Sequence, residues 1–232
     1  MKIGKKTADK RRKPGIAQDE WEFREQMFSE EHMFTRLKTV AEIENLPQTY
    51  KALYYIREKH KGQFRKKLKY SDAKIPYIVH PLMMACHAYS MGIKEDEALA
   101  VILLHDVCED CGVAAEELPF CDTVKSAVDL LTKKEEPGIS KETFTRQYYE
   151  GISKNRIASI AKVIDRCNNV STMAMSFSDK RLHEYIEETE TYVIPLLATI
   201  KQTQYDYNNP VFIIKYHMLS VLESLKVMLM EK

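Results

Sequence analysis

The most reactive part of the sequence is a group of ionisable residues that directly follows an apolar segment. Residues 98–104 are all apolar, and His105, Asp106, Glu109 and Asp110 come after them. If one helix carries this stretch, successive residues turn by about 100°, and the ionisable side chains share an arc of roughly 140°. Buried carboxylates are costly unless they are paired or bind a metal. The pattern therefore predicts a divalent-ion site whose other ligands come from elsewhere.

A second candidate ligand is His80, which stands immediately before Pro81 in a largely apolar segment. Proline is tolerated in the first turn of a helix, where its missing N–H would have no partner. The segment predicts a helix that begins near residue 78 or 79 and ends at Gly92. Taken alone, such a histidine is more often a hydrogen-bonded core residue than a metal ligand, so both interpretations stay open here.

The third candidate is Asp165, the single carboxylate of the segment IAKVIDRCNNVSTM. At helical spacing, Lys162, Asp165, Asn169 and Thr172 lie within an arc of about 80°. A polar stripe on an apolar helix predicts a lined cavity. Alternatively, Asp165 forms only an ion pair with Arg166 or Lys162.

The elements that position these residues are predicted to be helices. Apolar residues recur at three- and four-residue spacing, alternating runs are few, and only 7 Gly and 8 Pro interrupt the 232 residues. The fold class is therefore expected to be all-α. The expected helices are 17–45 in one or two pieces, 48–60, 78–91, 95–111, 121–133, 140–153, 155–175, 178–202 and 209–231.

Composition excludes several other classes of protein. A hydrophobic content of 44% and a net charge of +1 are typical of a globular domain rather than a disordered chain. The apolar runs are too short to span a bilayer, and the basic N-terminus lacks the apolar segment of a secretory signal. We therefore expect a cytoplasmic protein without a membrane partner. The 5 cysteines do not indicate a disulfide framework, and Cys108 and Cys111 lack the second pair of a zinc site.

Sequence motifs in a defined order give the most specific signal. They are HKGQFRK at 60–66, YIVHP at 77–81, LLHDVCED at 103–110, LLTK at 130–133 and IDRCNNVST at 164–172. In this order they resemble the motifs of the hydrolase domain of RelA/SpoT-type alarmone enzymes, within the HD phosphohydrolase superfamily. The resemblance extends over about residues 50–200 and implies an HD-domain helical bundle with a divalent-metal site.

The resemblance also implies a role for each matching residue. The implied metal ligands are His80, His105, Asp106 and Asp165, with Mn²⁺ as the favoured ion and other divalent metals as alternatives. The implied catalytic pair, which orients and deprotonates the attacking water, is Glu109 and Asp110. The implied substrate-binding residues are Arg65, Lys66, Lys162, Asn169 and Thr172.

The reaction implied by the resemblance is removal of the 3′-pyrophosphate of guanosine tetra- or pentaphosphate. A bound divalent ion lowers the pKa of water, a carboxylate accepts the proton, and Lys or Arg neutralises the phosphates. Two alternatives are an HD phosphohydrolase for another nucleotide, such as a nucleoside phosphate or NADPH, and a non-catalytic module that binds nucleotides. The non-catalytic module could also be regulatory. The expected partner of an enzyme of this kind is a small nucleotide substrate.

The sequence departs from the family pattern at several places. Asn168 stands where the family has His, Cys111 replaces a Thr, and the loop 67–75 is longer than usual. His87 occupies a position that is normally apolar and is interpreted as a buried, hydrogen-bonded side chain. We expect these differences to alter the nucleotide pocket and to leave the ion site unchanged.

The distribution of charge suggests the domain organisation. Residues 1–16 are rich in Lys and Arg and predict a disordered basic tail, for which nucleic-acid binding is not the expected role. Residues 17–46 are expected to form a helical extension. Residues 47–232 would then form the HD-type hydrolase domain with its C-terminal helices.

Overall fold

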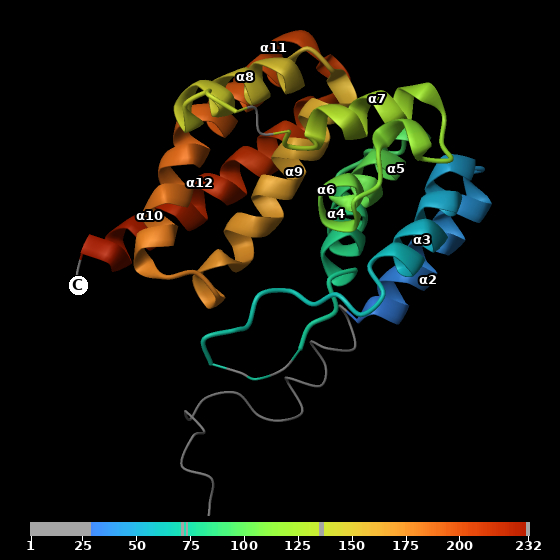
Figure 1. Cartoon of the computed structure of the whole chain (residues 1–232), viewed down its shortest axis with the longest axis horizontal. Coiled ribbons are helices and arrows are strands. Elements are labelled where there is room, and N and C mark those ends of the chain that lie inside the picture. Colours follow the sequence, from blue (N-terminus) through green and yellow to red (C-terminus); the bar gives the residue numbers. More distant parts are fainter. Residues whose placement is uncertain (1–28, 71, 73, 135–136, 231–232) are drawn as a thin grey trace, which may run out of the picture.

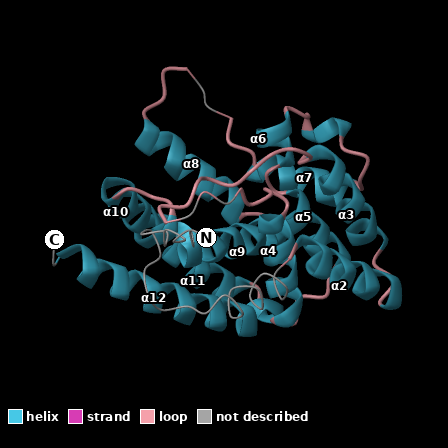
Figure 2. Cartoon of the chain, turned by 90° about the horizontal axis from the view of Figure 1, so that it is seen from below, coloured by secondary structure: helices cyan, strands magenta, loops and turns pink. Residues whose placement is uncertain are grey.

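The computed structural model describes residues 29–70, 72, 74–134 and 137–230, and in this part of the chain it contains helices and no strand (Figure 2). The predicted all-α class is therefore confirmed. The helices are α2 (Glu30–Ile43), α3 (Pro47–Lys59), α4 (Val79–Ser90), α5 (Asp96–Leu104), α6 (Val107–Cys111), α7 (Asp122–Leu131), α8 (Lys141–Ser153), α9 (Arg156–Thr172), α10 (Asp179–Glu188), α11 (Ile194–Thr203) and α12 (Asn208–Met230). None of the described helices combines the length and the apolar content needed to cross a membrane.

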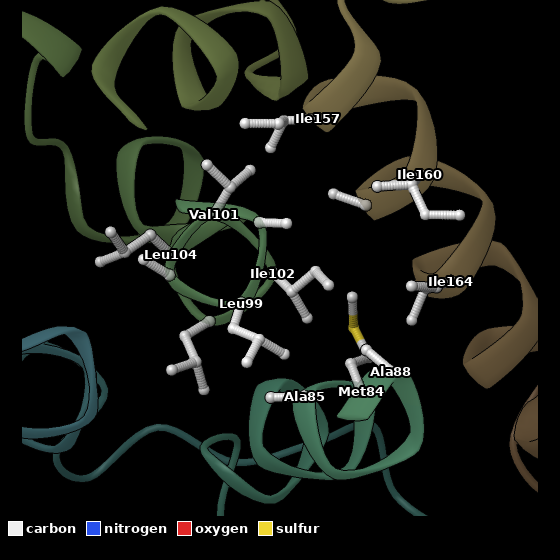
Figure 3. Packing of buried hydrophobic residues seen from close by; sticks show 14 of the residues in the cluster. Met84, Ala85, Ala88, Leu99, Val101, Ile102, Leu104, Ile157, Ile160 and Ile164 are labelled. Carbon is white, nitrogen blue, oxygen red and sulfur yellow. The ribbon is translucent and has the colours of Figure 1, made fainter. Parts of the chain in front are cut away.

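Helix α5 forms the centre of the fold. It packs against α3, α4, α7 and α9, and its residues 98–104 are completely buried. Figure 3 shows Ile102 of α5 pointing toward Met84 of α4 and Ile164 of α9. Because residues 98–104 of α5 are covered on all sides, this part of the helix has no polar face, which explains its unbroken apolar sequence.

Local signals set the ends of several helices. The Ser29 hydroxyl accepts a hydrogen bond from the backbone N–H of His32 at 3.2 Å and caps α2. The Asn155 side chain caps α9 in the same way through Ala158. Gly112, at φ 63°, ends α6 in the left-handed conformation that glycine adopts without strain.

The expected single helix at 95–111 is wrong at its centre. α5 ends at Leu104 and α6 begins at Val107, so His105 and Asp106 lie between two helices. His105 Nδ1 donates a hydrogen bond to the carbonyl oxygen of Ile102 at 2.9 Å, the acceptor that a continuous helix would use for the N–H of Asp106. The ionisable residues therefore do not share one helical face.

The remaining helix predictions agree with the structure to within a few residues wherever the structure describes them, and residues 17–28 of the predicted stretch 17–45 lie outside the described residues. The predicted helix 178–202 is observed as α10 and α11 joined by a π-helical turn, Thr189–Val193. The predicted basic tail 1–16 lies outside the described residues. Of the predicted extension 17–46, α2 packs against α3 and α4 and buries its apolar face in the same core (Figure 1).

We expect Ile102→Ala to lower the free energy of unfolding by about 2–5 kcal/mol, because the change leaves a cavity between α4, α5 and α9. Urea denaturation followed by circular dichroism measures this loss. The matched control is Ile43→Ala, since Ile43 is 77% exposed, and it should change the stability by less than about 0.5 kcal/mol. Similar losses for the two variants would contradict the central role of α5.

Candidate metal centre and nucleotide cleft

Three packed helices bring the central ligand candidates together. His80 lies in the first turn of α4, His105 follows the last residue of α5, and Asp165 lies in α9. These helices pack against one another in pairs. One ligand atom from each residue lies within 4.8 Å of the other two, and all three side chains are buried. This arrangement can enclose a single metal ion.

Both histidines are held in the tautomer that a metal requires. His80 Nδ1 donates to Asn168 Oδ1 at 2.7 Å, and His105 Nδ1 donates to the Ile102 carbonyl. Their Nε2 atoms lie 3.3 Å and 3.8 Å from Asp165 Oδ1. Since each Nδ1 carries the proton, each Nε2 can present a lone pair to an ion. Burial lowers the pKa of His80 and favours this neutral form.

Asp106 approaches the same place from the turn between α5 and α6. Its Oδ2 lies 2.7 Å from His105 Nε2 and 3.9 Å from His80 Nε2. His105 Nε2 is buried and, despite this short distance, makes no hydrogen bond of acceptable geometry. Burial opposes protonation of His105, but the Asp106 carboxylate outweighs it and raises the pKa. A positive charge between His105 Nε2 and Asp106 Oδ2 is therefore favourable, and it can be supplied by a proton or by a metal ion.

Asp165 is the most strongly compensated carboxylate of the cluster. Lys162 Nζ lies 2.9 Å from Asp165 Oδ2, and Asn169 Nδ2 donates to Oδ1 at 2.6 Å. Burial opposes ionisation, but the Lys162 ammonium and the nearby histidines hold the pKa of Asp165 well below its usual range. Arg166 contacts Glu188 instead, so the alternative pairing of Asp165 with Arg166 is wrong. The polar stripe predicted for α9 is present.

The donor set fits a divalent metal. Two imidazole nitrogens and one or two carboxylate oxygens are ligands that Mn²⁺, Fe²⁺, Co²⁺ and Zn²⁺ all accept. Among the described residues, His105 Nε2 makes no hydrogen bond of acceptable geometry although it lies 2.7 Å from Asp106 Oδ2, and this is the observation that most directly indicates an ion. His80, His105 and Asp165 would hold it, and Asp106 is close enough to join them.

The predicted catalytic carboxylates, Glu109 and Asp110, lie on α6 and are exposed, not buried as the sequence suggested. The break before α6 turns them away from the core and toward the cleft. Partial burial and the Asp106 carboxylate raise the pKa of Asp110. Glu109 Oε2 accepts a long hydrogen bond from the backbone N–H of Lys133 at 3.5 Å.

The basic loop that leads to α4 is held by two backbone hydrogen bonds, one within the loop and one to the segment after α9. The backbone N–H of Arg65 donates to the Ile75 carbonyl at 2.8 Å, and that of Lys69 donates to the Met175 carbonyl at 2.8 Å. The Arg65 guanidinium reaches Asn169 Oδ1 at 3.4 Å. Lys66 Nζ lies 4.9 Å from the centre of the Phe177 ring. The loop therefore places cations beside the polar face of α9.

All of the predicted site residues line one open cleft of about 1380 Å³. The cleft runs between the 60–77 loop, α4, α6 and α9. Its lining includes His80, His105, Asp106 and Asp165, the carboxylates Glu109 and Asp110, and the predicted substrate residues Arg65, Lys66, Lys162, Asn169 and Thr172. The structure thus brings together residues that are up to 107 positions apart, from Arg65 to Thr172 (172 − 65).

The sequence interpretation missed some neighbours of the cluster. The Tyr77 hydroxyl donates a hydrogen bond to Asp106 Oδ2, although Tyr77 had no assigned role. Burial, followed by the Asp106 charge, raises the pKa of Tyr77 and keeps it a donor. Asn168 was expected to affect only the pocket, but it accepts a hydrogen bond from His80, one of the candidate ligands. Its position three residues after Asp165 was the available signal.

The chain is similar to curated bacterial enzymes over part of their length. It is 31% identical over 176 residues to the guanosine-3′,5′-bis(diphosphate) 3′-pyrophosphohydrolase of Vibrio cholerae, a match that covers 69% of this chain and 23% of that protein. It is 30% identical over 151 residues to the protein of the same name from Aquifex aeolicus, a match that covers 61% of this chain and 20% of that protein. The chain thus spans about a fifth of the length of these relatives. No family model matches the sequence.

A solved structure has the same fold. It is that of a metazoan ortholog of SpoT that hydrolyzes ppGpp, with a TM-score of 0.58 and 19% identity over 76% of this chain and 94% of that one. At this identity the likeness shows the fold alone. Together the comparisons confirm the predicted resemblance to SpoT/RelA-type hydrolases and the predicted HD-type helical bundle.

We expect Asp165→Asn to weaken Mn²⁺ binding by at least about tenfold, because the change removes the charged oxygen at the centre of the cluster. Isothermal titration of the purified protein with Mn²⁺ measures the affinity, and circular dichroism verifies the fold. The control is Asp129→Asn. Asp129 lies on α7, and its carboxylate pairs with Lys134. Equal affinities for the Asp165 variant and the parent would place the ion elsewhere.

Asn168→Leu should also weaken Mn²⁺ binding, by about 10–100-fold, since it leaves His80 Nδ1 without an acceptor and frees the ring to turn. Asn168→Asp keeps an acceptor oxygen at the same position and should retain most of the affinity. The same titration compares the three proteins. If Asn168→Leu binds Mn²⁺ as tightly as the parent, Asn168 does not orient the ligand.

Proposed function

We propose that the chain is a metal-dependent pyrophosphohydrolase that removes the 3′-pyrophosphate of guanosine tetra- or pentaphosphate. The observation that carries the proposal is the meeting of the imidazole and carboxylate cluster with carboxylates and cations in one cleft. The names of the bacterial relatives and of the metazoan SpoT ortholog support this choice of reaction. A small anionic nucleotide is the expected ligand of such a cleft.

Mn²⁺ is the ion that we propose for the cluster formed by His80, His105, Asp106 and Asp165. A bound divalent ion lowers the pKa of water and withdraws charge from a phosphoryl oxygen. The residues around it supply the remaining functions. Lys162 keeps Asp165 ionised, and Tyr77 fixes the orientation of Asp106.

Glu109 and Asp110 are proposed to hold the attacking water and to accept its proton. Both lie in the cleft on α6, within a few residues of the ligands His105 and Asp106. A carboxylate with a raised pKa is a stronger base, and Asp110 has this property. The two carboxylates can therefore bind the water between them and direct it toward the phosphoryl group.

The substrate base and the phosphates nearest the metal cluster are proposed to lie against the basic loop and the end of α9. Arg65, Lys66 and Lys162 provide positive charge, and Arg65 can bind phosphate oxygens in a bidentate manner. Asn169 offers an amide for hydrogen bonds. The Thr172 hydroxyl donates its proton to the carbonyl oxygen of Asn168 at 3.2 Å. It can therefore only accept hydrogen bonds from the substrate.

The decisive test is incubation of the purified protein with Mn²⁺ and a panel of nucleotides, followed by identification of the products. The panel includes guanosine tetraphosphate, nucleoside monophosphates and NADPH. We expect pyrophosphate and guanosine diphosphate from the tetraphosphate as the fastest reaction. Faster release of inorganic phosphate from a monophosphate or from NADPH would replace the alarmone assignment by a more general nucleotide phosphohydrolase.

The double variant Glu109→Gln, Asp110→Asn should bind Mn²⁺ like the parent but lose at least about a hundredfold in turnover, the usual scale for removal of a general base. A matched control is Glu116→Gln with Glu117→Gln, an exposed pair of carboxylates outside the cleft. Turnover is measured from pyrophosphate release at saturating nucleotide. Unchanged turnover in the first variant would assign proton removal to another group.

A further inference from the structure

The cleft continues past the metal cluster to an end formed by α2, α4, α9 and α12. We refer to this part as the distal end, and its polar lining includes His32, Arg36, His87, Ser90, Ser171 and His217. α4 packs against both α2 and α9, and α9 packs against α12, so packed helices frame the distal end. Its own residues are accessible: Arg36, Ser90 and Ser171 are exposed, and His87 and His217 are half-buried. None of these residues was assigned a role in the reaction.

Arg36 presents unused donors to the distal end. Its Nη2 donates to Ser90 Oγ at 3.0 Å, while the Ser90 hydroxyl donates its own proton to the Cys86 carbonyl at 2.8 Å. Toward Arg36 the serine is therefore an acceptor, and the contact holds the guanidinium against α4. Arg36 has no carboxylate partner among the residues that the structure describes. Its other N–H groups are available for a ligand.

His87 was expected to be a buried, hydrogen-bonded side chain, and this is wrong. It is only half-buried and makes no hydrogen bond within the described part of the chain. Burial, followed by the proximity of His217, lowers the pKa of His87, so at neutral pH it is an uncharged imidazole with one free N–H. A polar group that replaces an apolar one without finding a protein partner is suited to a ligand.

His217 completes the distal end from α12. The Ser171 hydroxyl donates to the Cys167 carbonyl at 2.7 Å and lies 2.7 Å from His217 Nε2. Because the serine has a single proton, Nε2 must be the donor in the second contact. This interaction orients the His217 ring beside His87.

The cleft has an uneven distribution of charge. Its carboxylates, Asp106, Glu109, Asp110, Asp165 and Glu188, belong to α6, its preceding turn, α9 and α10, and none belongs to α2, α4 or α12. The distal end therefore combines an arginine and imidazole N–H donors without a lining carboxylate. This composition is favourable for an anion and unfavourable for a second metal ion.

We propose that the distal end is a subsite for a second phosphate group of the substrate, the 5′-diphosphate of a nucleotide whose 3′-pyrophosphate lies at the metal cluster. This inference rests on the proposed function. His87 follows His80 by seven residues on α4, a separation of about 10.5 Å along the helix axis. A ribose that carries phosphates on opposite sides can bridge such a distance, whereas a nucleoside monophosphate cannot occupy both places.

The first experiment compares guanosine tetraphosphate with guanosine 3′-diphosphate, which lacks the 5′ phosphates. The KM for the tetraphosphate should rise by about tenfold in Arg36→Gln and by about threefold in His87→Ile. In both variants kcat should change by less than about twofold, because the distal end binds the substrate but takes no part in the hydrolysis. The KM for the 3′-diphosphate should stay at the parent value. Lys38→Gln, a change on the same helix α2 outside the cleft, is the control and should affect neither substrate.

The second experiment does not depend on hydrolysis. The full chain is titrated with inorganic pyrophosphate in buffer without divalent metal, and Arg36→Gln should bind about tenfold more weakly than Lys38→Gln. If neither nucleotide is hydrolysed but this difference is present, the proposed function fails and the subsite stands. Two outcomes would overturn the subsite proposal when the tetraphosphate is hydrolysed. In the first, Arg36→Gln matches the control in both experiments, and in the second, it shifts the KM equally for both substrates.

Discussion

The buried carboxylate of Asp165 is the charge on which the organisation of the site depends. Within a helical bundle this group is separated from water, and an uncompensated charge there would be strongly destabilising. Lys162, three residues earlier on α9, and Asn169, four residues later, each contact one of its oxygens. His80 and His105 approach the same carboxylate from α4 and α5. The cluster is thus a set of mutually compensating groups that also forms a cation site.

The apolar helix α5 makes this compensation geometrically stable. Its residues 98–104 have no exposed surface, so its position relative to α4 and α9 is determined by side-chain packing on every side. The ionisable residues begin where this packing ends. As a result, His105 is held rigidly at the edge of the core, whereas Glu109 and Asp110 extend into the cleft on a short separate helix.

The cleft is divided into regions of different charge. Carboxylates gather near the cluster of His80, His105 and Asp165, cations of the 60–77 loop lie along one side, and the distal end has an arginine and histidines. The net charge of +1 gives no indication of this separation. For the nucleotide that we propose as the substrate, this separation would favour discrimination by the position of phosphate groups rather than by total charge.

The sequence alone determined the features that depend on local periodicity. The helices, the apolar centre at 98–104 and the polar stripe Lys162, Asp165 and Asn169 follow from helical spacing, because residues three and four apart are always neighbours on a helix. The ordered motifs additionally identified the residues that gather in the cleft.

Contacts between distant segments were decided only by the tertiary structure. The bond from His80 to Asn168 joins residues 88 positions apart, and Tyr77 reaches Asp106 across 29. The break at His105 depends on its imidazole taking the Ile102 carbonyl. That His87 has no hydrogen-bond partner among the described residues likewise depends on which helices surround it. Helical periodicity specifies which residues share a face, but it contains no information about which faces meet, and that is set by the packing of the whole core.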